Sequence, residues 1–488
     1  MNIMIPEVNI YAVIPQLILV AIGTLVLILG LFNFFRRCLP YLNITLLVAC
    51  GLFLTTFLGQ RAIGFSSITP MMVMDDFSLV CTLIFIGGCI LTILISISYN
   101  EIMTINRGEY YALLTFAVAG MSMMAASTDL FSFFLGLEVL SISLYVLIGF
   151  DQDNNSSNEA AVKYFLLGAF ASGFIIYGIA LIYGATGSTD YDAIVKAGVL
   201  GSTGTADTLL LGGVALLLVG LGFKISMVPF HSWTPDVYQG APTPVAAFLS
   251  TGSKAAVFVV LIRLLSSVFS DLQMEVSAVI TVLAVLTIGF GNIVALVQTN
   301  LKRLLAYSSI SHAGYMLLPF ISNSQDGNAS IIFYLIVYTA MNIAAFGVLA
   351  LMSTRSTTSD TLDGLTGLGR RAPLYAAIMT IVLLSLAGLP PTAGFMAKFY
   401  LFSNVISEGN IGLAVFGLLF SGISLYYYLR VVIWMYMRQD PKEKTPGYQP
   451  VSISGLTALC ISTLAILAGG IFPSELIEIA QQAVMALQ

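Results

Sequence analysis

The chain has 488 residues, of which 58% are hydrophobic and only 9% are charged, and its mean hydropathy is +0.96. A soluble domain carries roughly a quarter charged residues, so this composition excludes an ordinary soluble protein and indicates an integral membrane protein. The formal net charge of -5 is small and the basic residues are scattered, which argues against a nucleic-acid partner. Neither glycine-rich nucleotide-binding pattern occurs, so ATP bound by this chain does not drive transport.

Apolar runs long enough to cross a bilayer as helices recur along the whole sequence, whereas barrel strands would be much shorter. Breaking these runs at polar, Pro and Gly clusters predicts about fourteen transmembrane helices, so the fold class is a polytopic all-α membrane protein. We place the spans at residues 10–32, 40–59, 77–98, 109–127, 129–150, 159–184, 208–238, 242–268, 275–299, 302–321, 327–353, 373–405, 408–437 and 451–472.

The loops between these spans differ in charge. The even-numbered loops hold only Arg61 and Lys196. The basic residues in or beside the odd-numbered loops are Arg36, Arg37, Arg107, Lys302, Arg303, Arg355, Arg370, Arg371, Arg438, Lys442 and Lys444. Because positive charge stays on the cytoplasmic side, the odd loops are predicted to be cytoplasmic and both termini periplasmic in a bacterial inner membrane.

Two spans carry helix breakers. Span seven contains Pro229 and Pro235, and span twelve contains LAGLPPTAGFMAKF at 386–399. Proline removes a backbone donor, so both helices should break inside the membrane, at places typical of a transporter's binding region. The broken helix is the fourth of five in spans 4–8 and again in spans 9–13, which predicts two inverted repeats.

The predicted division of the chain follows from these repeats. Helices one to three precede them and helix fourteen follows them. The predicted units are residues 1–107, 108–270 for the first repeat, 271–440 for the second repeat, and 441–488.

Several ionisable residues lie inside apolar spans. A lysine at the centre of a spanning helix costs about 2.5–3.5 kcal/mol, so these groups should face the bundle interior, paired or hydrated. Because a buried lysine beside a movable carboxylate can take up or release a proton near neutral pH, the pattern predicts a proton relay rather than a single pocket. The candidates are Glu138, Lys163, Lys224, Lys254 and Lys398.

Other interpretations of these residues stay open. The alternative for some lysines, Lys163 above all, is that they snorkel from a span end or are held in static ion pairs. The only histidines, His231 and His312, either bridge the lysines or are hydrogen-bonded interior residues, and a haem between them has no other support. Glu109 is either a proton-uptake group or an exposed helix end, and snorkelling is favoured for Arg430. The five cysteines show no metal-ligand spacing.

Three long motifs carry a family resemblance: GFKISMVPFHSWTPDVYQGAPTPV, QTNLKRLLAYSSISHAGY and LAGLPPTAGFMAKFY. With them the sequence resembles the antiporter-like membrane subunits of respiratory complex I along essentially the whole chain. The N-type subunits of bacterial NADH–quinone oxidoreductase are most similar. M-type relatives place a glutamate where Lys398 stands, and L-type relatives carry a long C-terminal extension that is missing here.

The resemblance implies a fold of fourteen helices with inverted five-helix repeats, and roles for individual residues. Glu138 and Lys224 match the family's Glu–Lys pair, Lys163 and Lys254 match connecting lysines towards the middle of the membrane, and Lys398 matches the lysine of the second half-channel. His231 and His312 also lie in family motifs.

The resemblance further implies that this chain holds no cofactor. NADH, FMN, iron–sulfur clusters and quinone would belong to partner subunits, and the other membrane subunits of complex I would surround this chain. The expected function is proton export coupled to electron transfer from NADH to quinone. The alternatives are a core subunit of a multisubunit cation/proton antiporter, and a passive scaffold whose buried charges hold subunits together.

Overall fold

The computed structural model describes residues 9–60, 62–64, 71–197, 204–354, 360–438 and 452–487. Four basic residues used to predict the orientation, Arg61, Arg355, Lys442 and Lys444, lie outside these ranges. Within the ranges the chain is almost entirely helical, and its only sheet is the short antiparallel hairpin of β1 (Ile63–Gly64) and β2 (Val73–Met74). The all-α prediction is therefore confirmed.

The helices follow the predicted spans in order. The first group is α1 (Ile14–Gly30), α2 (Leu39–Thr55), α3 (Asp76–Ile102), α4 (Gly108–Ala126), α5 (Leu130–Ile148), α6 (Asn155–Thr186), α7 (Tyr191–Lys196), α8 (Gly204–Ile225), α9 (Trp233–Gly240), α10 (Thr243–Phe248) and α11 (Lys254–Arg263). The second group is α12 (Gln273–Ala295), α13 (Leu301–Leu317), α14 (Gln325–Met352), α15 (Leu368–Arg371), α16 (Pro373–Ala387), α17 (Ala393–Ser407), α18 (Ile411–Tyr436), α19 (Ile453–Ile471) and α20 (Ser474–Met485).

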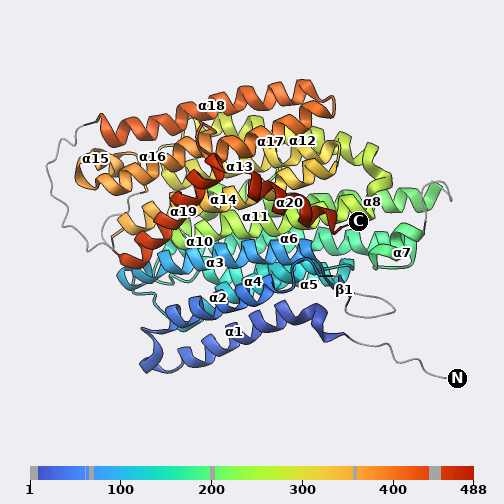
Figure 1. Ribbon diagram of the computed structural model, residues 1–488, viewed down its shortest axis with the longest axis horizontal. Helices are drawn as coiled ribbons and strands as arrows, with labels where there is room; N and C mark the ends of the chain where they lie inside the picture. Colours follow the sequence, from blue (N-terminus) through green and yellow to red (C-terminus); the bar gives the residue numbers. More distant parts are fainter. Residues whose placement is uncertain are drawn as a thin grey trace.

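Among the described residues, 11 helices are long and apolar enough to cross a membrane by themselves. The remaining predicted spans correspond to the shorter apolar helix α2, to α4 and to the pair α16 and α17. Each predicted span thus contains a helix or a pair of helices. The long helices lie side by side along one direction, with the start of α1, the end of α20, α7 and β1 at one end of the bundle and α15 at the other (Figure 1).

Burial separates a central layer from a peripheral one. In the most apolar window of Thr243–Val268, which contains α10 and α11, 100% of the residues are buried, against 28% in α18. α13 and α14 are also largely buried, whereas α1, α6, α12 and α19 expose much of their apolar surface. Because lipid is as apolar as these side chains, the peripheral helices can face the bilayer while the central ones face only protein.

The two predicted helix breaks are present and have similar backbone geometry. α8 ends before Ser226, whose φ is 66°, and α16 ends before Gly388, whose φ is 85°. In each case the next N–H returns to a carbonyl five residues earlier, from Met227 to Gly222 and from Leu389 to Leu384. A proline follows three residues after each left-handed residue, so the chain cannot continue the helix.

One feature of span eight was not predicted. The α10–α11 span contains two π-helical segments, η3 (Leu249–Ser253) and η4 (Leu264–Val268). In η3, the hydroxyls of Ser250 and Thr251 donate to the carbonyl of Ala247. π-Helical segments frequently mark functional positions, and here η3 immediately precedes Lys254.

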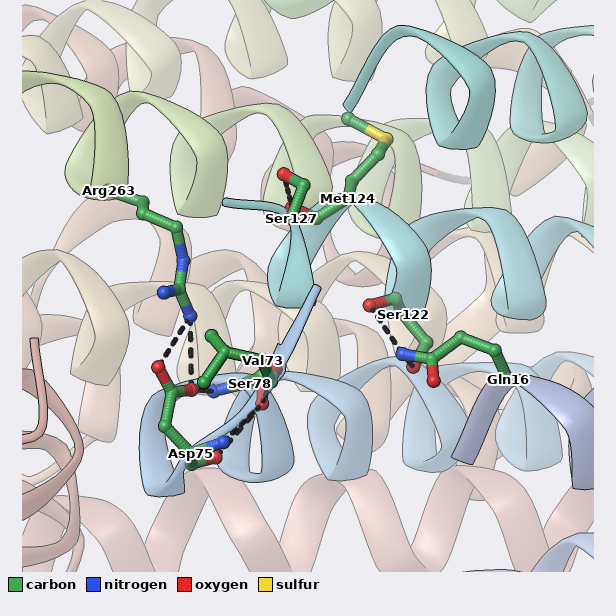
Figure 2. Close-up of polar contacts among 8 residues, drawn as sticks. All are labelled: Gln16, Val73, Asp75, Ser78, Ser122, Met124, Ser127 and Arg263. Atoms are coloured by element: carbon green, nitrogen blue, oxygen red, sulfur yellow. Dashed lines mark hydrogen bonds and ion pairs between the residues drawn. The ribbon is translucent and has the colours of Figure 1, made fainter. Parts of the chain in front are cut away.

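Polar contacts inside the bundle tie α1 and α3 to the following helices (Figure 2). Asp75 caps α3 by accepting from the Ser78 N–H, and its carboxylate accepts two hydrogen bonds from Arg263 Nη2, at 3.0 and 2.9 Å. Gln16 of α1 donates to the carbonyl and hydroxyl of Ser122 on α4, at 3.2 and 3.1 Å. Both residues of each contact are needed for stability, because removing one partner leaves a buried polar group without a hydrogen bond.

The last long helix covers the break between α16 and α17. A Cβ on Gly470 of α19 would lie 2.1 Å from the Pro391 carbonyl oxygen, so only glycine allows this approach. We expect Gly470→Ala to destabilise the protein by about 1–3 kcal/mol, because backbone atoms cannot yield as a side chain would. The thermal midpoint of the purified protein measures this effect, with Gly412→Ala as the control, since nothing lies within 4 Å of its Cβ. Equal midpoints for the two variants would contradict the expectation.

Candidate functional site

Three buried lysines form the centre of the candidate site. Lys224 lies at the end of α8, Lys254 at the start of α11 and Lys398 in α17, and their exposed fractions are 1%, 1% and 5%. Within the described residues none of them forms an ion pair with a carboxylate. Their ammonium groups donate to neutral oxygens instead. Neutral partners offset only part of the cost of burying an ammonium group.

Lys224 contacts the helix that carries Glu138. Its Nζ donates to Ser141 Oγ at 2.6 Å and lies 5.5 Å from the ring centroid of Tyr145, both on α5. Glu138 is one turn before Ser141 and accepts a hydrogen bond from Ser172 Oγ on α6 at 2.5 Å. The structure therefore brings Glu138 and Lys224 to the same part of α5, but it holds them through serine hydroxyls and not in a direct ion pair.

Lys254 occupies the fully buried span in the middle of the molecule. Its Nζ donates to the backbone carbonyl of Ser309 at 3.0 Å and to the Ser309 hydroxyl at 2.5 Å. That hydroxyl also accepts from Tyr338 at 2.8 Å, and the Tyr238 hydroxyl lies 3.5 Å away. Helices α9, α11, α13 and α14 thus meet at one lysine.

Lys398 is bound by the helix break of the second half. Its Nζ donates to the carbonyls of Leu386 and Ala387, at 3.0 and 2.9 Å, and to Ser421 Oγ on α18 at 2.8 Å. These carbonyls lie in the last turn of α16, which ends at Gly388, and the last carbonyls of a helix have no partner within it. The break therefore supplies the acceptors that a buried ammonium group needs.

His312 links the parts of the site that contain Lys254 and Lys398. The histidine is buried in α13, with Nδ1 2.7 Å from the Tyr334 hydroxyl and Nε2 3.3 Å from the Tyr428 hydroxyl. Tyr428 also hydrogen-bonds Ser308, which precedes the serine that holds Lys254. His312 is thus joined by hydroxyl contacts to the residues around Lys254, and its bridging role stays a prediction.

His231 lies apart from this group. It sits in the break between α8 and α9, half-buried, with its ring centroid 4.5 Å from that of Phe290. Its Nδ1 has no hydrogen-bond partner among the described residues, and no described contact joins it to a lysine of the site. A bridging role for His231 stays a prediction.

Lys163 differs from the expectation that it lies towards the middle of the membrane. Its side chain is 41% exposed, and its Nζ lies 2.8 Å from Glu159 and 2.9 Å from Asp236. Asp236 also accepts from Arg303 at 2.7 Å. The reason is position: Lys163 is only two turns into α6, close to the loop that precedes it. The structure therefore places Lys163 in a surface charge cluster, as the ion-pair interpretation predicts.

The remaining ionisable residues can also be placed. Glu109 is in the first turn of α4 and is exposed. Arg430 donates to the carbonyls of Leu296 and Gln298, at 2.6 and 2.5 Å, just beyond the end of α12. Arg430 therefore binds the C-terminal end of a neighbouring helix, where a positive charge is favourable.

Sequence reasoning missed the neutral groups of the site. A serine or tyrosine inside an apolar span carries little signal, because either residue is common in buried helices. The motif AYSSISHAGY offered the best hint, since its hydroxyls lie on the same helix as His312. The missed residues that contact the lysines or His312 are Ser141, Ser309, Tyr334, Tyr428 and Ser421.

Comparison with known proteins identifies the family. Residues 127–424 match the family described as NADH:quinone oxidoreductase/Mrp antiporter, transmembrane. NADH-quinone oxidoreductase subunit N of Trichlorobacter lovleyi is 44% identical over 479 residues, covering 98% of this chain and 97% of the relative. Subunit N 1 of Herpetosiphon aurantiacus is 42% identical over 488 residues, covering 99% and 98%.

Solved structures agree with this assignment. A chain of respiratory complex I from Thermus thermophilus has a TM-score of 0.79 and 34% identity, covering 95% of this chain and 99% of that chain. A chain of the Mrp complex from Dietzia, with a TM-score of 0.82, 21% identity and coverage of 98% and 96%, shows the fold alone. The chain belongs to the NADH:quinone oxidoreductase/Mrp antiporter family of membrane proteins and, within it, to the N subunits of NADH–quinone oxidoreductase.

Proposed function

We propose that this chain is a proton-translocating membrane subunit of an NADH–quinone oxidoreductase and that Lys224, Lys254 and Lys398 carry the protons. The observation that supports their role is that all three are buried and that, among the described residues, their hydrogen-bond partners are neutral. Such an amine can give up its proton without leaving a carboxylate partner uncompensated, and it can take the proton back without a large rearrangement. A lysine in a static ion pair would resist both steps.

The hydroxyl contacts suggest a route between the lysines. From Lys254 the route follows Ser309 and its neighbour Ser308 to Tyr428 and His312. The Lys398 ammonium lies 5.3 Å from the ring centroid of Tyr315, one turn beyond His312 on α13. Water molecules would complete the gaps, since a buried water needs two to four polar partners and this region supplies them.

The redox chemistry is proposed to take place in partner subunits. Among the described residues no group of three or more His, Cys, Asp or Glu side chains is arranged to hold a metal ion. NADH, FMN, iron–sulfur clusters and quinone would then bind elsewhere in the complex, and this chain would contact neighbouring membrane subunits and the bilayer. Its contribution is the movement of protons driven by electron transfer.

The proposed orientation places the end of the bundle with α15 in the cytoplasm of a bacterium, and both termini in the periplasm. The charges support it: Arg36, Arg107, Arg303 and Arg370 lie in or beside loops at the α15 end, whereas Lys196 lies in α7 at the other. We also propose the two inverted repeats, residues 108–270 and 271–440, because the fourth helix is the broken one in both. Residues 1–107 and 441–488 flank these repeats.

The experiment that tests the proposed function compares pumping with assembly. Lys224→Met should lower NADH-driven proton uptake into inverted membrane vesicles about three- to tenfold while the complex still assembles on a native gel, since a buried charge is replaced by an apolar side chain of similar length. Loss of the assembled complex would favour the scaffold interpretation, and normal uptake by an assembled complex would remove Lys224 from the route. A purified complex that lacks flavin and iron–sulfur proteins would favour the antiporter alternative.

A further inference from the structure

A cavity of about 750 Å³ opens at the α15 end of the bundle. It lies where the loop between α5 and α6, the turn between α9 and α10, the start of α13 and the described residues 353–354 and 360–361 beyond α14 meet. Its wall is rich in acidic side chains. The carboxylates that line it are Asp151, Asp153, Glu159, Asp236 and Asp360.

Among the described residues, the basic side chains that line the cavity with these carboxylates are Lys163 and Lys302, so five acidic side chains face two lysines. Lys163 is already paired with Glu159 and Asp236, and Arg303 pairs with Asp236 from beside the cavity. A cleft of one sign raises the local concentration of the opposite charge, so this cavity attracts cations and repels anions such as phosphate groups.

Asp360 lines this cavity, and one of its carboxylate oxygens is buried without a hydrogen-bond partner in the described part of the chain. The residue is 8% exposed and its Oδ1 has no partner among the described residues. Its Oδ2 lies 3.6 Å from Lys302 Nζ, a longer contact than the 2.9 Å between Arg263 and Asp75. A buried carboxylate oxygen with no partner is costly unless a proton, a water molecule or a cation binds it.

Backbone contacts hold Asp360 in place at the wall of the cavity, and they leave its carboxylate oxygens uninvolved. Its carbonyl accepts from the Leu301 N–H at 2.6 Å, and Thr361 forms a β-bridge with Asn300 just before α13. The carboxylate is thus fixed at the start of the helix that contacts Lys254.

Two helices lead from the cavity to Lys254. Lys302 and Ser309 are seven residues apart on α13, so they share a helix face and differ in depth by about 10 Å. Ser309 holds Lys254. On α9, Asp236 lines the cavity and Tyr238, two residues later, brings its hydroxyl within 3.5 Å of Ser309.

From this geometry we propose that the cavity is the vestibule in which the chain collects protons from the cytoplasm, and that Asp360 is the group that first binds the proton that reaches Lys254. The ligand is the hydrated proton. The Asp360 carboxylate takes a proton from hydronium, which leaves as water, and passes it through water and the Ser309 hydroxyl to the Lys254 amine, which restores the carboxylate. The inference rests on the proposed function, because it assumes that Lys254 accepts protons.

The test uses the whole complex in inverted vesicles, whose outer face is the cytoplasmic one. Asp360→Asn should lower the initial rate of NADH-driven proton uptake about three- to tenfold near pH 8 and by less than about twofold near pH 6, where free protons are a hundredfold more concentrated. Asp360→Glu should keep more than half of the rate at both pH values. Asp326→Asn is the control, since this exposed acid lies at the other end of the bundle, at the start of α14.

Two results would overturn the proposal. One is a normal uptake rate for Asp360→Asn near pH 8. The other is an equal loss for the Asn and Glu variants at both pH values, which would give Asp360 a structural role only. Lys254→Met in the same vesicles distinguishes a failure of the proposed function from a failure of the vestibule proposal. If the Lys254→Met complex pumps normally, the proposed function itself fails. If only the Asp360→Asn complex pumps normally, the vestibule proposal alone is wrong.

A second variant keeps the proposal testable if Asp360→Asn does not assemble. Asp360→Cys is close to aspartate in size, and reaction with carboxyethyl methanethiosulfonate returns a carboxylate to the cavity. Uptake should recover with this reagent and not with methyl methanethiosulfonate, which adds a neutral group. Equal recovery with both reagents would overturn the proposal. The parent complex, treated with the same two reagents, controls for reaction at the exposed Cys38 and Cys460.

Discussion

Lys254→Met is expected to lower NADH-driven proton uptake about a hundredfold, to the background of the vesicles, because removing a positioned proton carrier typically costs 10²–10⁴ in rate. Lys254 is the buried lysine on which four helices converge, and the serine that holds it connects to both Tyr338 and Tyr238. No other amine is placed there to replace it within the described residues. The loss of proton uptake should therefore exceed that of Lys224→Met, because Lys224→Met leaves Lys254 in place.

The matched measurements for Lys254→Met are assembly and quinone reduction. Methionine has a similar length and no charge, so burial in this apolar span should not destabilise the complex. Lys196→Met is the control, because this exposed lysine lies in α7 at the opposite end of the bundle from the vestibule. An assembled Lys254→Met complex that pumps at the parent rate would rule out a proton route through α11.

The fold could be predicted far more fully than the site, and span seven shows why. Apolar length and the positions of Pro229 and Pro391 depend on local physics, since an apolar run of this length crosses a bilayer as a helix and proline interrupts that helix. Both breaks were therefore predictable to within a few residues. The π-helical segments before and after α11 were not, because the residues of η3 are compatible with an ordinary helix and only packing against its neighbours selects the wider turn.

The site was predictable in its charges and not in its connections. A lysine in an apolar span stands out because its burial is costly, so Lys224, Lys254 and Lys398 could be found from the sequence. Their partners are hydroxyls and backbone carbonyls, which every helix contains, and the choice among them depends on how the helices pack. For Lys163 the charge was found but its surroundings were not. Its apolar neighbours suggested a position towards the middle of the membrane, whereas its place near the start of α6 lets it pair with Asp236 at the surface.

Lys398→Arg is expected to leave an assembled complex whose proton uptake falls about a hundredfold. Arginine keeps the positive charge and has five N–H donors, so it can satisfy the carbonyls of Leu386 and Ala387 and the hydroxyl of Ser421. It does not lose its proton in proteins, so it cannot pass one on. The substitution therefore preserves what a structural charge would supply and removes only what a proton carrier must do.

Lys398→Met is the matched variant for this test. Methionine leaves the last carbonyls of α16 without the ammonium donors, at a cost of about 1–3 kcal/mol for each unsatisfied acceptor, so its complex should have a lower thermal midpoint than the Arg complex. If Lys398 served only to fill the helix break, uptake would follow stability, and the Arg variant would pump while the Met variant failed. If Lys398 carries protons, both variants fail to pump although only the Met variant is destabilised. The carbonyls of the break need only a hydrogen-bond donor, whereas transport needs a donor that can lose its proton and bind another.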